Sequence, residues 1–393
     1  MILEYIHGDN SRERLELPHK VEVSERFEYI NSSNKLEYIK KFLPSFHSGQ
    51  KMVLFDSNHK QLLEFYQKSD INSFDGLDET QAQILFFTSG SSGFPVGAFK
   101  TKENLFKEVE VLQEMLTQYS IQRVVVTVPF VHIYGVLAGL LLPHSFGDIT
   151  LVVKEDFLPY ELLEEASHKN TLVITTPVFI KSLGKLSEKK DLSGNIFICS
   201  TGPLHNDDVT AFEKLYCADL MQLFGSTETG GIAYKYSDEE EWRVLPSVDI
   251  STQEDKLSIS SPFISSFTLN KCILSLSQPF TTEDIVEISK EGFKLLGRSN
   301  KIIKIAGKRI SATQIETILE ELCGVEVAVV TLVYKKELLR SEQILITLQA
   351  ESEISKKDIK TKINEYYGVL TIPFRVEYVE KINYSAMGKK VLF

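Results

Sequence analysis

The run Arg123-Val-Val-Val-Thr-Val128 is the first of five short β-branched segments that decide the fold. The other four follow at similar spacing: ITLVV from Ile149, TLVITT from Thr171, NIFICS from Asn195 and DLMQLF from Asp219. Their starts are 22 to 26 residues apart, which is the length of one strand, one helix and two short loops. The spacing predicts strands that alternate with helices.

The segments between these strands carry helix signals. Pro159 precedes the expected helix YELLEEASHK. Residues 206–208 (Asn-Asp-Asp) precede the expected helix VTAFEKLY, and we expect the side-chain oxygens of these three residues to cap its first turn. Near-continuous apolar strands covered by helices are typical of a parallel sheet, whose ligands bind near the carboxyl ends of the strands. The sequence therefore predicts an α/β fold with its ligand site at that edge.

The pattern changes twice further along the chain. Short alternating runs from Gly231 to about Leu296 predict antiparallel strands. From Arg298 onward the pattern predicts a helix at 313–322, strands at 325–333 and 343–349, a helix at 355–367 and a strand at 374–378. We expect a large N-terminal domain over residues 1–297 and a small mobile α+β domain over 298–393. The large domain would comprise αβ subdomains over about 1–150 and 151–230 and a small antiparallel β subdomain over 231–297.

Composition excludes several classes of protein. The chain has 393 residues, of which 43% are hydrophobic, so it is too long for one compact core. Its net charge of -11 disfavours binding to nucleic-acid phosphate. Its four cysteines lie far apart without CxxC spacing, which favours reduced thiols over disulfides or zinc. The N-terminus has no apolar signal region, and the longest apolar span, Ile133–Leu142, is too short to cross a bilayer. We expect a cytoplasmic protein with neither a nucleic-acid partner nor a membrane span.

Two polar segments next to apolar runs carry possible chemistry. The segment FTSGSSGFPVG at 87–97 combines glycines with hydroxyls suited to phosphate oxygens, although no Gly-Lys-Ser/Thr closes it as in a Walker loop. The segment LFGSTETGG at 223–231 places a carboxylate between hydroxyls at a strand end, a donor set suited to Mg²⁺. Taken alone, each segment also fits an ordinary solvated turn.

Six collinear segments together resemble the core motifs of the adenylate-forming superfamily, which includes acyl-CoA synthetases, aryl acid ligases and peptide-synthetase adenylation domains. They are TSGSSGFPVG, VPFVHIYG, LFGSTETGG, TTEDIV, GRSNKIIKIAGKRI and the terminal GKK. The resemblance implies ATP and Mg²⁺ as cofactors. It also implies that a carboxylic acid attacks the α-phosphate to give acyl-AMP and pyrophosphate, after which a thiol displaces AMP.

The resemblance further implies roles for individual residues. The nucleotide-binding residues would be Thr88, Ser89, Gly90, Ser91, Ser92, Gly93, Thr201, Gly202, Pro203, Phe224, Gly225, Ser226, Thr227, Asp284 and Arg298. Among these, Phe224 would stack on adenine and Thr227 would contact the α-phosphate. Glu228 would bind Mg²⁺, and Asp284 and Arg298 would hold the ribose hydroxyls.

The C-terminal segment would supply the remaining parts of the site. Lys389 would bridge the acyl carboxylate and the phosphate during adenylation, with Lys390 as the register alternative. The resemblance also implies that Asn300 would lie at the hinge, where related enzymes carry Asp or Lys, and that the loop at Gly307 would line the entry of the thiol.

Two departures from the family pattern affect these expectations. Val96 replaces the usual loop lysine, for which Lys100 or Lys102 are candidate substitutes. The loss predicts weaker ATP binding or a degenerate enzyme. Only 87 residues precede Thr88, which predicts a shortened N-terminal subdomain.

The segment VPFVHIYG bears on the substrate. It offers His132 and Tyr134 where peptide-synthetase domains usually place an aspartate that binds an α-ammonium, so the resemblance favours an aryl or fatty acid over an α-amino acid. His132 would be a catalytic residue near the carboxylate of the substrate. The alternative is that His132 lines the wall of the pocket and has no direct role in the chemistry. The predicted substrate-binding residues are His132, Tyr134, Gly135, Phe179 and Gly202.

The sequence leaves two candidates for the thiol that accepts the acyl group. Segments such as HIYGVLAGLLLP resemble those of ligases of aryl-polyene pathways, which charge an acyl carrier protein. The segment from Arg298 has a net charge of +4 against -15 for the residues before it, which suits docking of an acidic carrier. The phosphopantetheine of CoA is the other candidate. A non-catalytic homologue and an adenylating enzyme with another acceptor are the alternative functions.

Overall fold

The computed structural model describes residues 1–16, 21–24, 26–30, 34–55, 64, 77, 82–88, 96–270, 272–299, 302–305, 308–334, 342–367, 374–384 and 390–391. Contacts divide the chain into two compact units. The first comprises Met1–Ile250 and Ile259–Phe280, and the second comprises Ser251–Ser258 and Thr281–Phe393.

The first unit is built on a large sheet with strand order β13-β12-β11-β10-β9-β7-β8-β1-β2. The strands are β1 (Ile2–Ile6), β2 (Arg12–Leu15), β7 (Arg123–Val126), β8 (Thr150–Lys154), β9 (Thr171–Thr175), β10 (Ile196–Cys199), β11 (Asp219–Ser226), β12 (Gly230–Tyr236) and β13 (Trp242–Val244). The five predicted strands lie side by side and pair in parallel, which confirms the sequence prediction. The sequence did not indicate that β1 pairs in parallel with β8 or that β2 folds back antiparallel onto β1.

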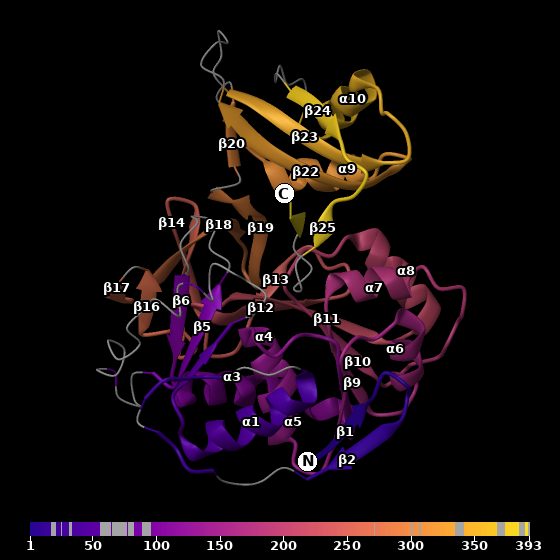
Figure 1. Cartoon of the computed structure of the whole chain (residues 1–393). Helices are drawn as coiled ribbons and strands as arrows, with labels where there is room; N and C mark the ends of the chain where they lie inside the picture. The colour runs from indigo at the N-terminus through magenta and orange to yellow at the C-terminus, as the bar shows by residue number, and fades with distance from the viewer. Residues whose placement is uncertain are drawn as a thin grey trace. The chain divides into compact units, whose positions relative to one another are not determined.

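Helices cover both faces of this sheet (Figure 1). On one face lie α6 (Pro159–Glu165), α7 (Pro177–Leu183) and α8 (Asn206–Tyr216), and on the other lie α1 (Lys35–Ser48), α3 (Lys102–Met115) and the segment of α4 (Ile133–Val136), η3 (Leu137–Leu141) and α5 (Leu142–Ser145). A short η2 (Thr117–Tyr119) follows α3. Val125, Val173 and Phe197 of the strands pack against Leu162 and Phe212 of the first set.

The start of α8 differs from the sequence prediction. The helix begins at Asn206 itself and its N-cap is His205, so residues 206–208 lie inside the first turn and their side chains do not precede it. Asp207 and Asp208 are acidic residues in that first turn. Negative charge is favourable there because of the helix dipole, so the residues favour the helix start through charge and not as its cap.

A second sheet in this unit has the order β17-β16-β6-β5-β4-β3. Its strands are β3 (Glu28–Tyr29), β4 (Met52–Leu54), β5 (Ile84–Thr88), β6 (Val96–Lys100), β16 (Phe267–Asn270) and β17 (Cys272–Ser275). β5 and β6 pair antiparallel with Thr88 opposite Val96. The glycine-rich segment therefore joins two strands of a hairpin, and α3 begins only after β6.

The second unit contains the predicted α+β segment. The strands and helices that lie wholly or mostly in this unit are β14 (Asp249–Gln253), β15 (Lys256–Ser260), β18 (Phe280–Ile288), β19 (Gly292–Arg298), β20 (Ile302–Ile305), β21 (Lys308–Ser311), α9 (Ala312–Glu320), β22 (Val325–Tyr334), β23 (Glu342–Ala350), α10 (Lys356–Tyr367), β24 (Phe374–Tyr378), β25 (Asn383–Tyr384) and β26 (Lys390–Val391). α9 and α10 pack on the sheet β22-β23-β24 through Ile315, Leu319, Ile346 and Ile359. The predicted element order is confirmed. The domain boundary at residue 298 and the mobility of the small domain stay predictions.

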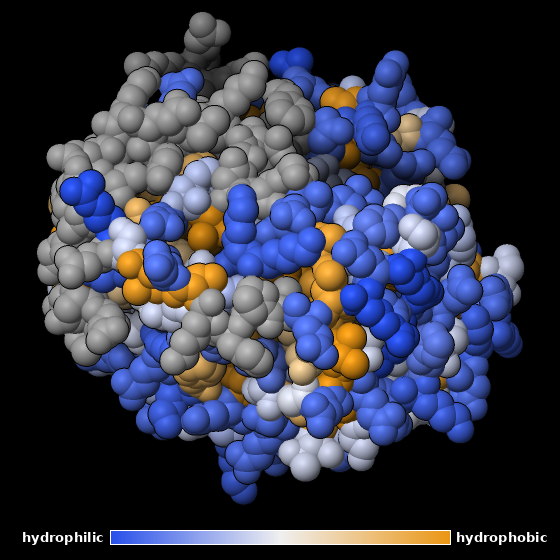
Figure 2. Space-filling view, turned by 60° about the horizontal axis from the view of Figure 1, so that its bottom comes forward, coloured by the Kyte–Doolittle hydropathy of each residue, from blue (hydrophilic) through white to orange (hydrophobic). Residues whose placement is uncertain are grey.

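The surface agrees with the charged composition. On the face shown in Figure 2, hydrophilic residues cover most of the coloured area, and hydrophobic residues form narrow strips between them. Among the described residues, no helix combines the length and apolar character that crossing a membrane requires.

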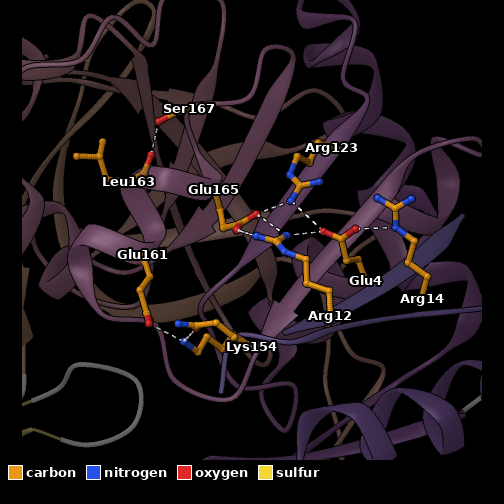
Figure 3. Close-up of polar contacts among 10 residues, drawn as sticks. Glu4, Arg12, Arg14, Arg123, Lys154, Glu161, Leu163, Glu165 and Ser167 are labelled. Carbon is orange, nitrogen blue, oxygen red and sulfur yellow. Dashed lines mark hydrogen bonds and ion pairs between the residues drawn. The ribbon is translucent and has the colours of Figure 1, made fainter. Parts of the chain in front are cut away.

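A network of charges around two buried carboxylates lies where β1 and β2 meet the start of β7 and helix α6 (Figure 3). We call Glu4, Arg12, Arg14, Arg123 and Glu165 the Glu4 network. Glu4 is 2% exposed and accepts from Arg12 at 2.7 Å, Arg14 at 2.8 Å and Arg123 at 3.2 Å. Glu165 pairs with Arg12 and Arg123. Burial raises the pKa of Glu4, but the hydrogen bonds from Arg14 and Arg12 and the charge of Arg123 outweigh it and lower the pKa to about 2.

Candidate functional site

The segment that would hold nucleotide and metal is the turn between β11 and β12, residues 226–231, here called the 226–231 turn. Ser226 N donates to Thr229 Oγ1 at 3.0 Å, and Thr229 Oγ1 donates to the Gly230 carbonyl at 2.8 Å. Thr229 is fully buried, whereas Thr227 and Glu228 between them are half-buried. The hydrogen bonds of Thr229 therefore close the turn, and Thr227 and Glu228 lie at its tip.

Gly225 just before this turn and Gly230 within it leave no room for a side chain. A Cβ on Gly225, just before the turn, would lie 2.3 Å from the Gly230 carbonyl oxygen. Gly230 has φ +71°, and its Cβ would lie 2.5 Å from Glu108 Oε2. Since L-residues avoid this backbone region, the glycines of LFGSTETGG are required by the path of the main chain.

Lys100 at the end of β6 and Glu108 in α3 support the turn from beneath. Lys100 Nζ donates to the Glu228 carbonyl at 3.0 Å and also to the Phe263 carbonyl. Glu108 Oε1 accepts from Gly231 N at 2.8 Å. Lys100 is 1% exposed and Glu108 is 5% exposed, so both contacts are shielded from water.

Burial perturbs both groups in opposite directions. It raises the pKa of Glu108, while the charge of Lys100 and the bond from Gly231 N act against the shift. It lowers the pKa of Lys100, while Glu108 and Glu228 act against it. Each charge thus depends on the other for its stability in the interior.

The sequence does not identify Lys100 and Glu108 as supports of the turn. It offers Lys100 only as a substitute for the lysine absent at Val96, and a buried ammonium bound to main-chain carbonyls does not fit that role. Lys102 lies 5.6 Å from the ring centres of both Phe46 and Phe106. A signal was present for Glu108: it falls on the apolar face formed by Leu105, Val109 and Leu112, where a charge calls for a partner.

The predicted adenine-pocket residues come together at the carboxyl ends of β10 and β11. Ser200 Oγ donates to the Leu223 carbonyl at 2.9 Å, which ties the segment 200–203 to the end of β11. Thr201 has φ +87°, and Gly202 and Pro203 are exposed. Phe224 is half-buried, and its ring centre lies 5.3 Å from that of Trp242.

The predicted acyl-pocket residues have structural contacts of their own. Tyr134 is buried, and its hydroxyl donates to the Ile198 carbonyl at 2.8 Å. A Cβ on Gly135 would lie 2.0 Å from the Pro129 carbonyl oxygen, so close backbone packing alone requires glycine there. His132 is the half-buried N-cap of α4, and Phe179 packs against the core beneath α7. Their contact with a substrate stays a prediction.

In the second unit, the structure brings the predicted ribose-binding pair together. Asp284 and Arg298 are register partners on β18 and β19, and Arg298 Nε lies 3.4 Å from Asp284 Oδ1. Burial raises the pKa of Asp284, while the charge of Arg298 acts against this shift.

Lys390, the register alternative, has structural contacts in the same unit. Its ammonium lies 2.6 Å from Glu320 Oε1 and donates to the Ala328 carbonyl at 3.0 Å. Several predicted site residues lie outside the described part of the chain: Ser89, Gly90, Ser91, Ser92, Gly93, Asn300, Gly307 and Lys389. Of Thr88, the structure describes only the main chain, at the end of β5.

The 226–231 turn offers one carboxylate and one hydroxyl, which suits Mg²⁺ better than a metal ion that is coordinated by protein side chains alone. Among the described residues, no group of three or more His, Cys, Asp or Glu side chains is arranged to hold a metal ion. Mg²⁺ takes one or two protein carboxylates and completes its shell with phosphate oxygens and water. The half-buried Glu228 beside the Thr227 hydroxyl meets that requirement.

Solved structures with the same fold cover nearly the whole chain. The o-succinylbenzoate CoA synthetase MenE of Bacillus subtilis in complex with its acyl-adenylate intermediate aligns with a TM-score of 0.79 at 16% identity, over 99% of this chain and 94% of that one. ATP-bound MatB of Rhodopseudomonas palustris aligns with a TM-score of 0.77 at 14% identity, over the same shares.

Sequence relatives are also ligases by name. The protein named "Putative long chain fatty acid-CoA ligase VraA" of Staphylococcus aureus (strain COL) is 26% identical over 366 residues, covering 84% of this chain and 78% of its own length. The 4-coumarate–CoA ligase of Cereibacter sphaeroides is 27% identical over 244 residues, covering 61% of this chain and 54% of its own length.

The layered fold and the ordered motifs define an adenylate-forming enzyme, which confirms the resemblance seen in the sequence. The model of the family described as AMP-binding enzyme matches residues 27–260, more than half of the chain. The chain belongs to this AMP-binding enzyme family.

Proposed function

We propose that the protein activates an aryl or fatty acid with ATP and Mg²⁺ and transfers the acyl group to a phosphopantetheine thiol. The observation that carries this proposal is the 226–231 turn, with Phe224, Thr227 and Glu228 beside the 200–203 segment at the carboxyl ends of β10 and β11. Ligands of parallel α/β sheets bind at this edge. The acyl-CoA ligases among the relatives support a carboxylic acid as the substrate.

The first step would join two anions. A carboxylate oxygen attacks the α-phosphorus, the bond to the bridging oxygen breaks, and pyrophosphate leaves with the electron pair. Positioning and neutralisation of charge supply most of the catalysis in such a step. Thr227 would hold the α-phosphate, Glu228 would hold Mg²⁺, and Lys389 would bridge the two reacting groups. A bound Mg²⁺ supplies positive charge to the phosphate oxygens.

The second step would transfer the acyl group. A thiolate sulfur attacks the acyl carbonyl carbon, and the bond between that carbon and the phosphate oxygen breaks, so AMP leaves. The two candidate acceptors are the thiol of CoA and the phosphopantetheine thiol of an acyl carrier protein. We favour the carrier protein, because the segment from Arg298 has a net positive charge and opposite charges steer encounter.

Exchange of labelled pyrophosphate into ATP tests the first step directly. We expect exchange that depends on an added aryl or fatty acid and is absent with α-amino acids. Glu228→Gln is expected to lower it about 100-fold, because a metal-binding charge is lost. Glu110→Gln, on the exposed face of α3, is the matched control and should retain the activity. Binding of ATP or AMP without exchange for any acid would instead support a non-catalytic homologue, the reading that Val96 favours.

Mass spectrometry then identifies the acceptor. CoA, a phosphopantetheine-bearing acyl carrier protein and a simple amine are offered together with the active acid. The proposal expects a thioester on the carrier protein. A product on the amine alone would contradict transfer to a thiol.

A further inference from the structure

The main chain of the 226–231 turn is held at two separate points from below. The Glu228 carbonyl accepts from Ser265 N at 2.9 Å and from Lys100 Nζ at 3.0 Å. Three residues later, Gly231 N donates to Glu108 Oε1 at 2.8 Å. The first contact, at the Glu228 carbonyl, holds the part of the turn that carries Thr227 and Glu228. The second contact, at Gly231 N, holds the start of β12.

Hydrogen bonds also connect the elements that carry Lys100 and Glu108. Thr101 caps α3 through a reciprocal pair of 3.0 Å hydrogen bonds with Asn104. Asn104 Nδ2 donates to the Pro262 carbonyl at 2.7 Å, which fixes the segment that contains Phe263 and Ser265. Lys100 therefore joins the turn and this segment to β6, while Glu108 joins the turn to α3.

The glycines show that Glu108 is fitted to the turn. A Cβ on Gly231 would lie 2.8 Å from Glu108 Oε1, and one on Gly230 would lie 2.5 Å from Oε2. A carboxylate so close to two adjacent glycines leaves the main chain little freedom to shift. Neither Lys100 nor Glu108 reaches solvent, so neither would touch the nucleotide itself.

We propose that Lys100 and Glu108 are positioning residues, which hold the main chain of the 226–231 turn so that Glu228 and Thr227 keep the orientation that Mg²⁺ and nucleotide require. This inference rests on the proposed function for its catalytic consequence, but its structural part concerns the turn alone. A positioning role predicts a selective effect: magnesium dependence changes while the apparent affinity for the acid does not.

Amide hydrogen exchange of the full-length protein tests the structural part. We expect Glu108→Leu to speed exchange of the 226–231 peptide about fivefold, because one buried hydrogen bond is lost. Glu108→Gln keeps an oxygen that accepts from Gly231 N but removes the charge that stabilises the buried Lys100 ammonium, so we expect it to speed exchange less than Glu108→Leu does. The double variant Lys100→Gln with Glu108→Gln keeps hydrogen-bonding groups without an unpaired charge and remains available if the leucine variant fails to fold. It should exchange more slowly than Glu108→Gln and stay close to the parent.

The control is Glu165→Gln, which removes the charge of a carboxylate that is as buried as Glu108 but belongs to the Glu4 network. It is expected to lower stability without changing exchange in the 226–231 peptide. Equal exchange in Glu108→Leu and the parent, or equal acceleration in Glu165→Gln, would overturn the inference. So would equal acceleration in Glu108→Gln and Glu108→Leu.

Pyrophosphate exchange in the same variants tests the catalytic part. We expect Glu108→Leu to raise the KM for Mg²⁺ about tenfold with the KM for the acid unchanged, because small misplacements of reacting groups are costly. A proportional rise in both constants would contradict positioning of the metal-binding turn. If the parent protein shows no exchange with any acid, the proposed function fails, and hydrogen exchange alone decides whether the two residues hold the turn.

Discussion

Lys389→Ala is expected to lower acid-dependent pyrophosphate exchange by about 10²- to 10³-fold, the usual loss when a charged group that stabilises the transition state is removed. Two anions must approach each other in the adenylation step, and an ammonium between them lowers that repulsion. The effect should fall on kcat more than on the KM for ATP, because Lys389 would act mainly in the transition state.

Two neighbouring lysines provide controls for this prediction. Lys381 is exposed, and Lys381→Ala should retain full exchange. Lys390 pairs with Glu320, so Lys390→Ala should lower the stability of the second unit and leave more exchange activity than Lys389→Ala. Complete loss in Lys390→Ala with full activity in Lys389→Ala would assign the catalytic ammonium to the register alternative.

Arg123→Met is expected to lower the free energy of unfolding of the first unit by about 3 kcal/mol, because removing one partner leaves buried carboxylates short of positive charge. Arg123 is 13% exposed at its side chain and contacts both Glu4 and Glu165. Arg12 still pairs with both carboxylates, which keeps the loss near the lower end of the usual range.

Urea unfolding followed by the fluorescence of Trp242, the one tryptophan of the chain, measures this loss within the first unit. The matched control is Lys107→Met, which removes an exposed pair with Glu110 and should cost about 0.5 kcal/mol or less. Equal losses in the two variants would show that the Glu4 network adds no more than a surface pair.

The same network predicts a pH dependence with a definite sign. The pKa of Glu4 falls from 4.5 to about 2 on folding, so its contribution is fully present above the unfolded pKa and is lost as the pH falls through the folded one. The pKa of Glu165 is also lowered: burial raises it, but the bonds from Arg12 and Arg123 outweigh that effect. The difference in stability between the parent and Arg123→Met should therefore shrink between about pH 4.5 and pH 2. A constant difference over this interval would contradict the linkage.

Much of the fold was predictable because it depends on local periodicity. The β-branched segments from Arg123 to Phe224 became adjacent parallel strands, and the segment after residue 311 has the predicted order of helices and strands. The pairing of β1 with β8 and of β16 with β6 was not predictable, because those contacts join segments far apart in the sequence.

The candidate site divides in the same way. The motifs located the 226–231 turn and the pairing of Asp284 with Arg298, since each lies within a hairpin. They did not reveal Lys100 and Glu108, whose role depends on β6 and α3 passing beneath a turn more than 100 residues later in the chain. A charge on an apolar helix face marks such a residue but does not identify its partner.

The position of β1 has a consequence for synthesis of the protein. Ile2 pairs with Thr150, so β1 is made on the order of ten seconds before its parallel neighbour β8, at about 5–20 residues per second, and until then only β2 can pair with it. During that interval Leu3 and Tyr5, which are buried in the folded protein, remain open to other nascent chains. β1 is therefore a segment where holding by a chaperone would protect the growing polypeptide from aggregation.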